Sequence, residues 1–458
     1  MSDLAASAGL AVRPVSSLGR WRIVLLLMLF AALGHFNRVG ISVAGSEVFI
    51  PKLGLNAVQM GWVYTTFLIV YTAAMLPGGW IIDRLGPGFA LTILGLGMGS
   101  FVMLTGVTGW VRLESHQLWI ALLFIRGLAG SMNAPLHPGA ARVVSNLMTP
   151  SGRATANGMV TAGALIGIAA CYPVFGWLID RLGWQGAFIV SGLALFLYGV
   201  FWRTTISGRV DDLMHLPAAA TVNRPAGLTR PDDVDSPQEE SQRGNLSTAA
   251  DRWRVLTHAD LWLVTLSYAA FGYFQYLFFY WMSYYFESVL HVEDVASRRA
   301  SFLIMLAQGG GMAIGGLSTD IACRWLGTTL GRRCIVMLGM GLSGLFGLLG
   351  VQVSGMEQVT LCLALAMGAL GMCEGVFWTT ATDIGGRQAG FAGAFMNTGG
   401  NLGGLVSPVL TPSLAQSVGW TGAIAIACLI NLLGGLVWFL IHPHRHVDQS
   451  EALSRISD

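Results

Sequence analysis

The sequence predicts an all-α integral membrane protein with twelve transmembrane helices arranged as two pseudo-symmetric six-helix halves. Three observations support this prediction: an apolar composition, twelve apolar segments of membrane-spanning length, and an internal repeat. Of the 458 residues, 54% are hydrophobic and 11% are charged, and the mean hydropathy is +0.62. Soluble domains carry about 25% charged residues, so much of this surface is expected to face lipid.

Apolar runs of about 20 residues are typical of helices that cross a bilayer. The twelve expected spans are residues 21–46, 57–82, 88–110, 117–147, 154–179, 185–203, 258–287, 299–320, 332–352, 358–383, 388–409 and 418–441. The first run already has the length of a span, and the residues before it lack an apolar core. No cleavable signal peptide is therefore expected.

The placement of arginine predicts the orientation in the membrane. One side receives Arg13, Arg20, Arg22, Arg84, Arg153, Arg203, Arg209, Arg324, Arg332, Arg333, Arg387 and Arg445. The other side receives Lys52, Arg112, Arg181, Arg298 and Arg299. Because basic loops remain in the cytoplasm, both termini and the central loop are expected there, with the protein in the inner (plasma) membrane.

A polar, acidic and proline-containing stretch at 231–245 interrupts the apolar pattern and indicates a disordered linker. It divides the spans six and six. The expected domains are an N-terminal half at 1–206, a cytoplasmic linker at 207–257, a C-terminal half at 258–441 and a cytoplasmic tail at 442–458. The basic residues form no stripe and the cysteines show no metal-ligand spacing, so neither nucleic acid, nor a metal, nor a cofactor is expected as a partner.

The two halves repeat one another at an offset of 236 or 237 residues. GGWIID (78–83) matches GGLSTD (315–320), TAGALIG (161–167) matches TGGNLGG (398–404), and LGWQGAF (182–188) matches VGWTGAI (418–424). Three matches in the same order predict a duplicated six-helix unit with its binding site between the halves, near the bilayer midplane. At this offset Arg38 corresponds to Gln275.

Arg38 and Arg126 lie inside apolar spans that contain no neighbouring acid. A charge at membrane depth costs at least a few kcal/mol and usually has a function. A guanidinium offers a planar fork of donors that matches a carboxylate, so both arginines are expected to bind an organic anion. The alternative is a structural role, in which they bind Glu374 or helix carbonyl groups.

Three further ionisable residues lie inside spans and are candidates for proton coupling. Glu374 is an acid deep in the tenth span, where burial favours its neutral form; the alternative is a permanently neutral or paired glutamate. His35 shares a helix face with Arg38, and His137 corresponds to Glu374 at the repeat offset. For both histidines the alternative to a proton relay is a hydrogen-bonded helix contact.

Aromatic side chains with polar tips concentrate in the seventh span. Gln275 and Tyr276 are expected to line a sugar-sized cavity, whereas rings nearer the outer end are expected to anchor the helix at the interface. At the start of the second span, Asn56 and Gln59 predict a capping box, which is a structural feature.

The loop between the second and third spans carries Gly-Trp-Ile-Ile-Asp83-Arg84-Leu-Gly, and Asp320 and Arg324 repeat its charges in the second half. Acids at helix ends can pair with arginine or with the positive end of a neighbouring helix. These four residues are expected to act in gating; the alternative is a solvated charged turn.

The loop motif and the duplication resemble the major facilitator superfamily. A narrower resemblance is to its anion:cation symporter family, which includes galactonate carriers, sialin and the vesicular glutamate transporters. It is carried by the stretches at 37–45, 53–86, 126–158 and 395–408. The resemblance implies that Arg38 and Arg126 bind the substrate anion, and that Tyr71, Trp378, Thr379, Asn397 and Asn401 line the cavity. For the two asparagines, which share a face, interhelical hydrogen bonding is the alternative.

Two departures from this family concern proton coupling. Many proton-coupled members carry acids where this sequence has Asn37 and Asn133, and asparagine does not titrate. The two basic residues that follow the family's Asp-Arg-x-Gly loop are replaced by Pro87 and Gly88.

The sequence therefore predicts a secondary transporter, not an enzyme, that moves a sugar acid or another small carboxylate by alternating access. It is expected to work as a monomer in the lipid bilayer. Proton symport and uncoupled uniport or exchange both stay open. A multidrug exporter and a non-transporting membrane sensor are the alternatives from other functional classes.

Overall fold

The computed structural model describes residues 17–111, 113–148, 150–212 and 255–442, and these residues are almost entirely helical. The first half contains α1 (Ser17–Ala44), α2 (Ala57–Leu85), α3 (Pro87–Val107), α4 (Ser115–Asn133), α5 (Leu136–Leu147) and α6 (Pro150–Trp202). Short turns extend three of them: η1 (Gly45–Phe49), η2 (Thr108–Trp110) and η3 (Arg203–Ser207), the last followed by α7 (Gly208–Asp212).

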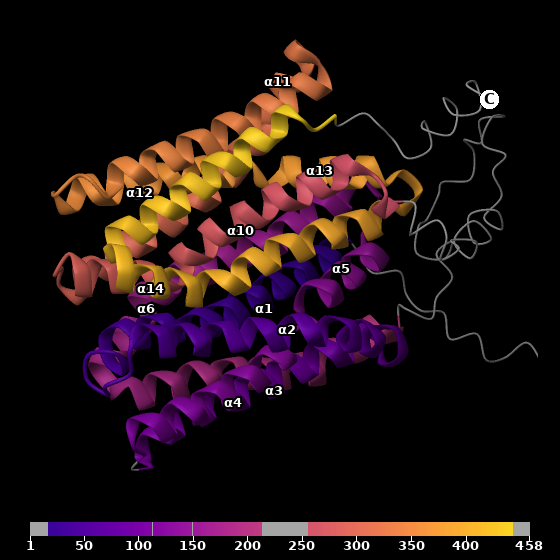
Figure 1. Cartoon of the computed structure of the whole chain (residues 1–458). Coiled ribbons are helices and arrows are strands. Elements are labelled where there is room, and N and C mark those ends of the chain that lie inside the picture. The colour runs from indigo at the N-terminus through magenta and orange to yellow at the C-terminus, as the bar shows by residue number, and fades with distance from the viewer. Residues whose placement is uncertain (1–16, 112, 149, 213–254, 443–458) are drawn as a thin grey trace, which may run out of the picture.

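The second half contains α10 (Ala259–Tyr284), α11 (Asp294–Gly350), α12 (Met356–Gly371), α13 (Glu374–Gly385) and α14 (Ala389–Leu436). Its short turns are η5 (Tyr285–Val289), η6 (Gly386–Gln388) and η7 (Val437–Phe439). Figure 1 shows the helices of the first half gathered below those of the second, with their axes running in roughly the same direction.

The described helices make twelve spans, as predicted. Eight helical segments are long and apolar enough to cross a membrane. Three of them, within α6, α11 and α14, contain two spans each, because the chain reverses at Gly183, Gly327 and Gly419. These glycines have φ of 69°, 78° and 73°, a backbone conformation that disfavours other residues. The eight segments thus provide eleven spans, and α10, which is not among them, is the twelfth.

The internal repeat extends to the contacts between helices. A Cβ added at Gly163 or Gly167 of α6 would collide with the carbonyl oxygens of Met28 and Ala32 on α1. In the second half, Gly399 and Gly403 of α14 face the backbone of Thr265 and Ala269 on α10 in the same way. Glycine pairs four residues apart let two membrane helices approach closely. The duplicated unit is therefore a packing unit as well as a sequence repeat.

Each half also contains one broken span at an equivalent position. The fourth span breaks between α4 and α5 at Ala134 and Pro135, because proline has no N–H to continue the helix. The tenth span breaks between α12 and α13 at Met372 and Cys373. Both breaks lie about halfway along their spans.

We call the end of the bundle that holds Ser17 and His442 the terminal end, and the opposite end the far end. At the far end the first half turns at Gly54 (φ 74°) and the second at His291 (φ 53°), which are 237 residues apart. The predicted capping box is confirmed, because the side chains of Asn56 and Gln59 each accept from the other's backbone N–H.

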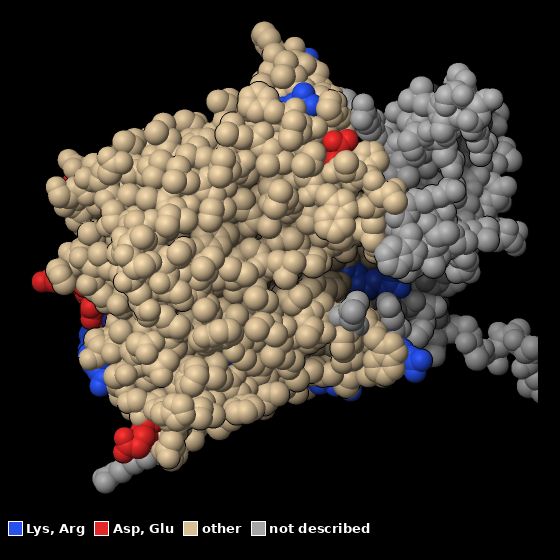
Figure 2. All heavy atoms as spheres, in the orientation of Figure 1, with Lys and Arg blue, Asp and Glu red and all other residues tan. Residues whose placement is uncertain are grey.

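The outer surface is apolar, as expected for a lipid-facing protein. Large apolar side chains such as Phe124, Leu317 and Leu433 are exposed on helices that cross the bundle. Figure 2 shows a broad tan band on the visible face, with most blue and red atoms near the two ends. Within the predicted linker, residues 208–212 form α7, where Asp211 accepts from the backbone N–H of Gly88 at 2.8 Å. Residues 213–254 and 443–458 lie outside the described residues, so the domain boundaries stay a prediction.

Candidate functional site

The candidate site lies where the two halves meet near the middle of the bundle. α1, α2 and α6 of the first half pack against α10, α11 and α14 of the second. Near the middle of the bundle, this interface is crossed by hydrogen bonds from Arg38 to the hydroxyl of Tyr276 (2.8 Å), from Thr65 to the carbonyl of Leu405 (2.9 Å), and from Tyr172 to the carbonyl of Phe279 (3.1 Å).

Arg38 projects from α1 into an aromatic enclosure at this interface. Its guanidinium carbon lies 5.6 Å from the ring centres of Phe67 and Tyr71 and 5.2 Å from that of Tyr276. Arg38 is 7% exposed, and no carboxylate within the described residues forms an ion pair with it. The aromatic faces offset part of the charge, because the quadrupole of a ring attracts a cation. The arrangement leaves a buried cation with donors free for an anion.

Arg126 is more deeply buried and is held differently. It donates to the backbone carbonyls of Asn37 (3.3 Å) and Arg38 (2.7 Å), and its guanidinium carbon lies 4.9 Å from the ring centre of Phe67. Its Nε has no hydrogen-bond partner. Arg126 therefore supports the turn of α1 that carries Arg38.

Several aromatic residues around the arginines were not singled out from the sequence. Phe67 contacts both guanidinium groups. Tyr64 stacks on Tyr280 at 4.8 Å between ring centres, and the Tyr280 hydroxyl is buried without a partner. Tyr280 lies one helical turn beyond Tyr276, and only its spacing from Tyr276 could have indicated this position.

Glu374 lies in the second half, at the start of α13, and contacts neither arginine. Its Oε1 accepts hydrogen bonds from the Tyr268 hydroxyl (2.7 Å) and from Trp378 Nε1 (3.0 Å). Its Oε2 is buried and has no partner. Tyr268 packs on Gly400 of α14, so this acid joins the seventh, tenth and eleventh spans.

The two histidines lie together beside Arg38. The rings of His35 and His137 are 5.2 Å apart in an edge-to-face arrangement, and His35 Nδ1 lies 3.1 Å from the carbonyl of Ala31. Asn37 and Asn133 are both buried; Asn37 donates to the carbonyls of Leu33 and Ser191. The Oδ1 atoms of both asparagines have no partner.

The remaining predicted cavity residues belong to α10, α13 and α14 of the second half. Tyr276 packs against Gly404 of α14, close to Asn401 in the chain, and Gln275, Asn397 and Asn401 are half-buried. Trp378 and Thr379 are exposed on α13; Thr379 donates to carbonyls of its own helix.

The predicted gating residues lie at the terminal end. Arg84 stacks over the ring of Trp80, with 4.7 Å from the guanidinium carbon to the ring centre. Arg324 and Asp320 are both exposed. The side chain of Asp83 lies outside the part of the structure that is described. In the same region Arg332 forms an ion pair with Asp383 at 2.7 Å, within the second half.

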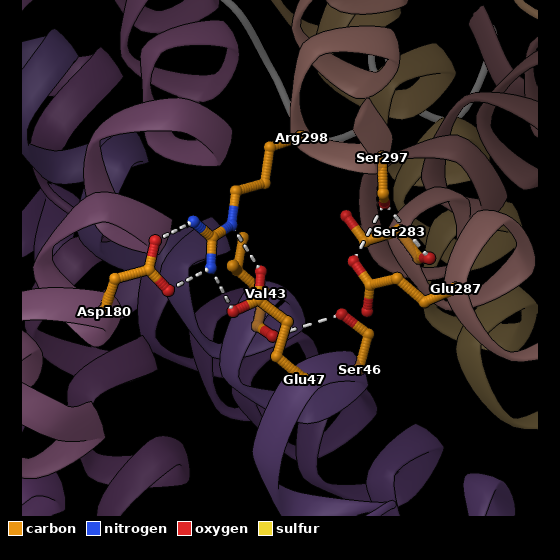
Figure 3. A network of polar contacts seen from close by, with 8 residues as sticks. All are labelled: Val43, Ser46, Glu47, Asp180, Ser283, Glu287, Ser297 and Arg298. Atoms are coloured by element: carbon orange, nitrogen blue, oxygen red, sulfur yellow. Dashed lines mark hydrogen bonds and ion pairs between the residues drawn. The ribbon is translucent and has the colours of Figure 1, made fainter. Parts of the chain in front are cut away.

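The strongest polar link between the halves is one that the sequence analysis missed. Arg298 of α11 binds two carboxylates of the first half, Glu47 of η1 and Asp180 of α6, at the far end (Figure 3). We call these three residues the Arg298 cluster. The sequence showed Arg298 only as one of the few basic residues on its side, and no local pattern joins three residues so distant in the chain. Within the described residues no group of three or more His, Cys, Asp or Glu side chains could hold a metal ion.

Comparisons with known proteins agree with this architecture. The family model of the Major Facilitator Superfamily matches residues 24–389 and 321–455. The probable galactarate/D-glucarate transporter of Bacillus subtilis is 28% identical, with 90% of this chain and 91% of that protein covered. The D-galactonate transporter of Escherichia coli O6:H1 is 26% identical, with 92% and 96% covered.

A third relative carries a different anionic group. The probable sulfoacetate transporter of Cupriavidus necator is 27% identical, with 93% of this chain and 94% of that protein covered. Among solved structures, a bacterial homolog of the human lysosomal transporter Spinster superposes with a TM-score of 0.70 at 16% identity, covering 93% of this chain and 97% of that one. The matching family model, the twelve spans and the repeated halves show that this multi-pass membrane protein belongs to the Major Facilitator Superfamily.

Proposed function

We propose that this protein is a secondary transporter of small organic anions, with sugar acids as the first substrates to test, and that it works by alternating access. The observation that carries the proposal is Arg38, a buried cation at the interface between the halves with no carboxylate partner in the described structure. A buried charge requires compensation, and a substrate carboxylate supplies it. The relatives named as transporters of galactarate, D-galactonate and sulfoacetate support this substrate class.

The two arginines divide the task in this proposal. Arg38 binds the carboxylate through its planar fork of donors, while Tyr276 orients the guanidinium from the second half. Arg126 holds the backbone carbonyls of Asn37 and Arg38 and so positions α1. Gln275, Asn397, Asn401, Trp378 and Thr379 then select among the hydroxyl groups of the substrate. The cavity binds one small anion and leaves its remaining contacts to neutral polar groups.

Alternating access requires that each end of the bundle opens in turn. The hydrogen bonds that Arg38, Thr65 and Tyr172 make to the other half, and the Arg298 cluster, lie between the middle of the bundle and the far end. We infer that this structure is the state closed at the far end. By the distribution of arginine, the terminal end is cytoplasmic and the protein resides in the inner membrane, with both termini cytoplasmic and one chain as the working unit.

The energy source is the second part of the proposal. Asn37 and Asn133 cannot carry a proton, so we propose Glu374 as the coupling group. Its Oε1 accepts hydrogen bonds from Tyr268 and Trp378, whereas its Oε2 has no hydrogen-bond partner and is available to bind a proton. The alternative is an uncoupled uniporter or exchanger for the same anions, in which Glu374 is structural.

The test is substrate counterflow in proteoliposomes with labelled D-galactonate and D-glucarate. Wild-type protein is expected to exchange at least one of them, and Arg38→Gln is expected to lose binding by roughly 100-fold or more, as expected when a charge-assisted bidentate contact is lost. Arg38→Lys should restore little, because an ammonium group lacks the planar fork.

Arg142→Gln is the matched control, since Arg142 is exposed at the terminal end of α5. Binding in Arg38→Gln that equals wild type, with Arg142→Gln also unchanged, would remove Arg38 from the site. The absence of counterflow for every carboxylate tested would contradict the transporter proposal itself.

A further inference from the structure

The Arg298 cluster joins the two halves through four hydrogen bonds (Figure 3). Arg298 Nε and Nη2 donate to the two carboxylate oxygens of Glu47, each at 2.7 Å. Arg298 Nη1 and Nη2 donate to the two oxygens of Asp180 at 2.5 and 2.9 Å. Arg298 and Glu47 are both 4% exposed, whereas Asp180 is about half-exposed. Separation of the halves at this end would leave a buried charge without its partner.

A second acid lies beside this cluster. Glu287 is the third residue of the π-helical turn η5, as Glu47 is the third residue of η1, and the two turns contact each other. Glu287 Oε1 accepts from the hydroxyl of Ser297 at 2.8 Å. Its Oε2 is buried and has no hydrogen-bond partner. Unlike Glu47, this carboxyl has no arginine within ion-pair distance among the described residues.

The charges around Glu287 favour a neutral carboxyl when the far end is closed. Glu47 faces it from η1 and Asp294 from the first turn of α11, and both are acids. Tyr64 of α2 is its other titratable neighbour. Lys52 and Arg181 lie near Asp180, which is half-exposed, and offset its charge. An ionised Glu287 would place an unpaired negative charge in a buried region beside Glu47, whereas a proton on Oε2 would remove it.

A serine hydroxyl lies beside the Glu287 carboxyl and can accept a hydrogen bond from its protonated form. Ser46 lies beside Glu287, and its hydroxyl donates to the carbonyl of Val43 at 3.1 Å (Figure 3). While that bond is made, the Ser46 oxygen can accept a hydrogen bond from Glu287; after rotation the same hydroxyl can instead donate to a carboxylate. A protonated carboxyl can donate to that oxygen, and a carboxylate cannot.

We propose that Glu287 is a proton-binding site that closes with the halves, so that acid on the far side of the membrane favours the state in which the Arg298 cluster is formed. This inference rests on the alternating-access function proposed above. When the far end opens, Glu287 and Glu47 separate, water reaches Glu287, and the proton leaves to the side from which it came. The site therefore sets the pH dependence of gating without adding a transported proton, which distinguishes it from Glu374.

The test measures the distance between the halves directly. Spin labels are placed at the exposed positions His116 and Val295 by cysteine substitution. The full-length protein has its native cysteines replaced, retains the thermal stability of the wild type, and is studied in lipid nanodiscs. In wild type the ratio of closed to open distances is expected to rise roughly threefold or more between pH 8 and pH 5.5, because protons bind the closed state more tightly. Glu287→Gln should be closed at both pH values.

Three further variants separate the possible causes. Glu357→Gln removes an exposed acid on α12 at the same end and should keep the wild-type response. His291→Gln tests the exposed histidine of the neighbouring turn and should also keep it. Glu47→Gln should shift the distances toward the open state at both pH values.

A wild-type distance distribution that does not change with pH would overturn the proposal, as would a full pH response in Glu287→Gln. Loss of the response in His291→Gln would assign the effect to that histidine instead. Because the distances are measured without substrate, they test the gate independently of counterflow. A failure of the transport proposal would therefore be seen in counterflow alone.

Discussion

Arg38 and Arg126 carry the same charge in different surroundings, although they lie on neighbouring helices. Arg38 is enclosed by aromatic rings and donates to the hydroxyl of Tyr276, whereas Arg126 is bonded to two main-chain carbonyls. The same distinction separates Glu47, which is bound by an arginine, from Glu374 and Glu287, which are not. At the scale of the residue, the side chains without a charged partner are the ones available for a substrate or a proton.

Glu374 provides a direct test of coupling. If its carboxyl carries the transported proton, substrate addition to proteoliposomes should drive proton uptake in wild type, and Glu374→Gln should abolish that uptake while exchange of substrate continues. A pH-sensitive dye inside the vesicles measures the flux, and Glu357→Gln serves as the control. Proton uptake that survives in Glu374→Gln would exclude Glu374 and direct attention to His35 and His137.

Gly176 makes room for the Arg298 cluster. A Cβ at this position of α6 would collide with the guanidinium of Arg298. Gly176→Ala is therefore expected to break the ion pairs and to lower stability by about 3–5 kcal/mol, as for the loss of one partner of a buried pair. Thermal unfolding in detergent measures the effect. Gly158→Ala on the same helix, where a Cβ meets nothing within 4 Å, should leave the midpoint unchanged or slightly higher.

At the scale of the element, turns and helix breaks recur in both halves. The turns at Gly86 and Gly327, at Gly183 and Gly419, and at Gly54 and His291 all use positive φ. In two of these pairs both members are glycine, and in the third the second half has histidine. Gly54 and His291 therefore share a positive φ although their side chains differ. This conformation costs conformational free energy at His291, because it is not a glycine.

His291 is the only described residue other than glycine with positive φ. His291→Gly is expected to raise stability by about 0.5–1 kcal/mol, because the left-handed conformation costs an L-residue about 1–2 kcal/mol and the exposed imidazole contributes little packing. Gly54→Ala should lower stability by a similar amount. Thermal midpoints of the purified variants measure both changes. His291→Asn should stay near wild type, since asparagine tolerates this conformation, and equal midpoints in all three variants would contradict a strained turn.

The fold was predictable from the sequence because apolar length, glycine spacing and the repeat are local patterns. The twelve spans followed from hydropathy, and the capping box from Asn56 and Gln59. The association of Arg38 with Tyr276 was only partly predictable, since the offset pointed to Gln275, one residue away. The Arg298 cluster joins residues up to 251 positions apart. Such contacts depend on how two halves meet, and a single sequence contains no periodic signal for them.

At the scale of the whole molecule, alternating access requires that interactions at one end of the bundle form while those at the other end break. The far end is closed by the Arg298 cluster, while Asp83, Arg84, Asp320 and Arg324 lie at the terminal end. A residue that stabilises one of the two states changes the rate of exchange between them. If it does not contact the substrate, the substrate affinity changes little.

Asp320→Asn and Asp83→Asn are therefore expected to slow counterflow several-fold with little change in substrate affinity. Initial rates at saturating substrate and half-saturation concentrations measure the two quantities separately. Arg181→Gln, at the opposite end of the bundle, serves as a control for loss of a surface charge. A tenfold loss of affinity with an unchanged maximal rate would place these aspartates in the binding site and not in the gate.

The hydrogen bonds from Arg126 to the main-chain carbonyls of Asn37 and Arg38 bear on the choice among anions. A short anion that reaches only Arg38 leaves those bonds intact. A longer dianion that draws Arg126 toward its second carboxylate must break them, and a hydrogen bond to a charged group contributes about 1.5–3 kcal/mol. The main-chain carbonyls of α1 thus compete with a second carboxylate for Arg126. The preference between mono- and dicarboxylates is therefore set by the length of the anion and by two hydrogen bonds within the protein.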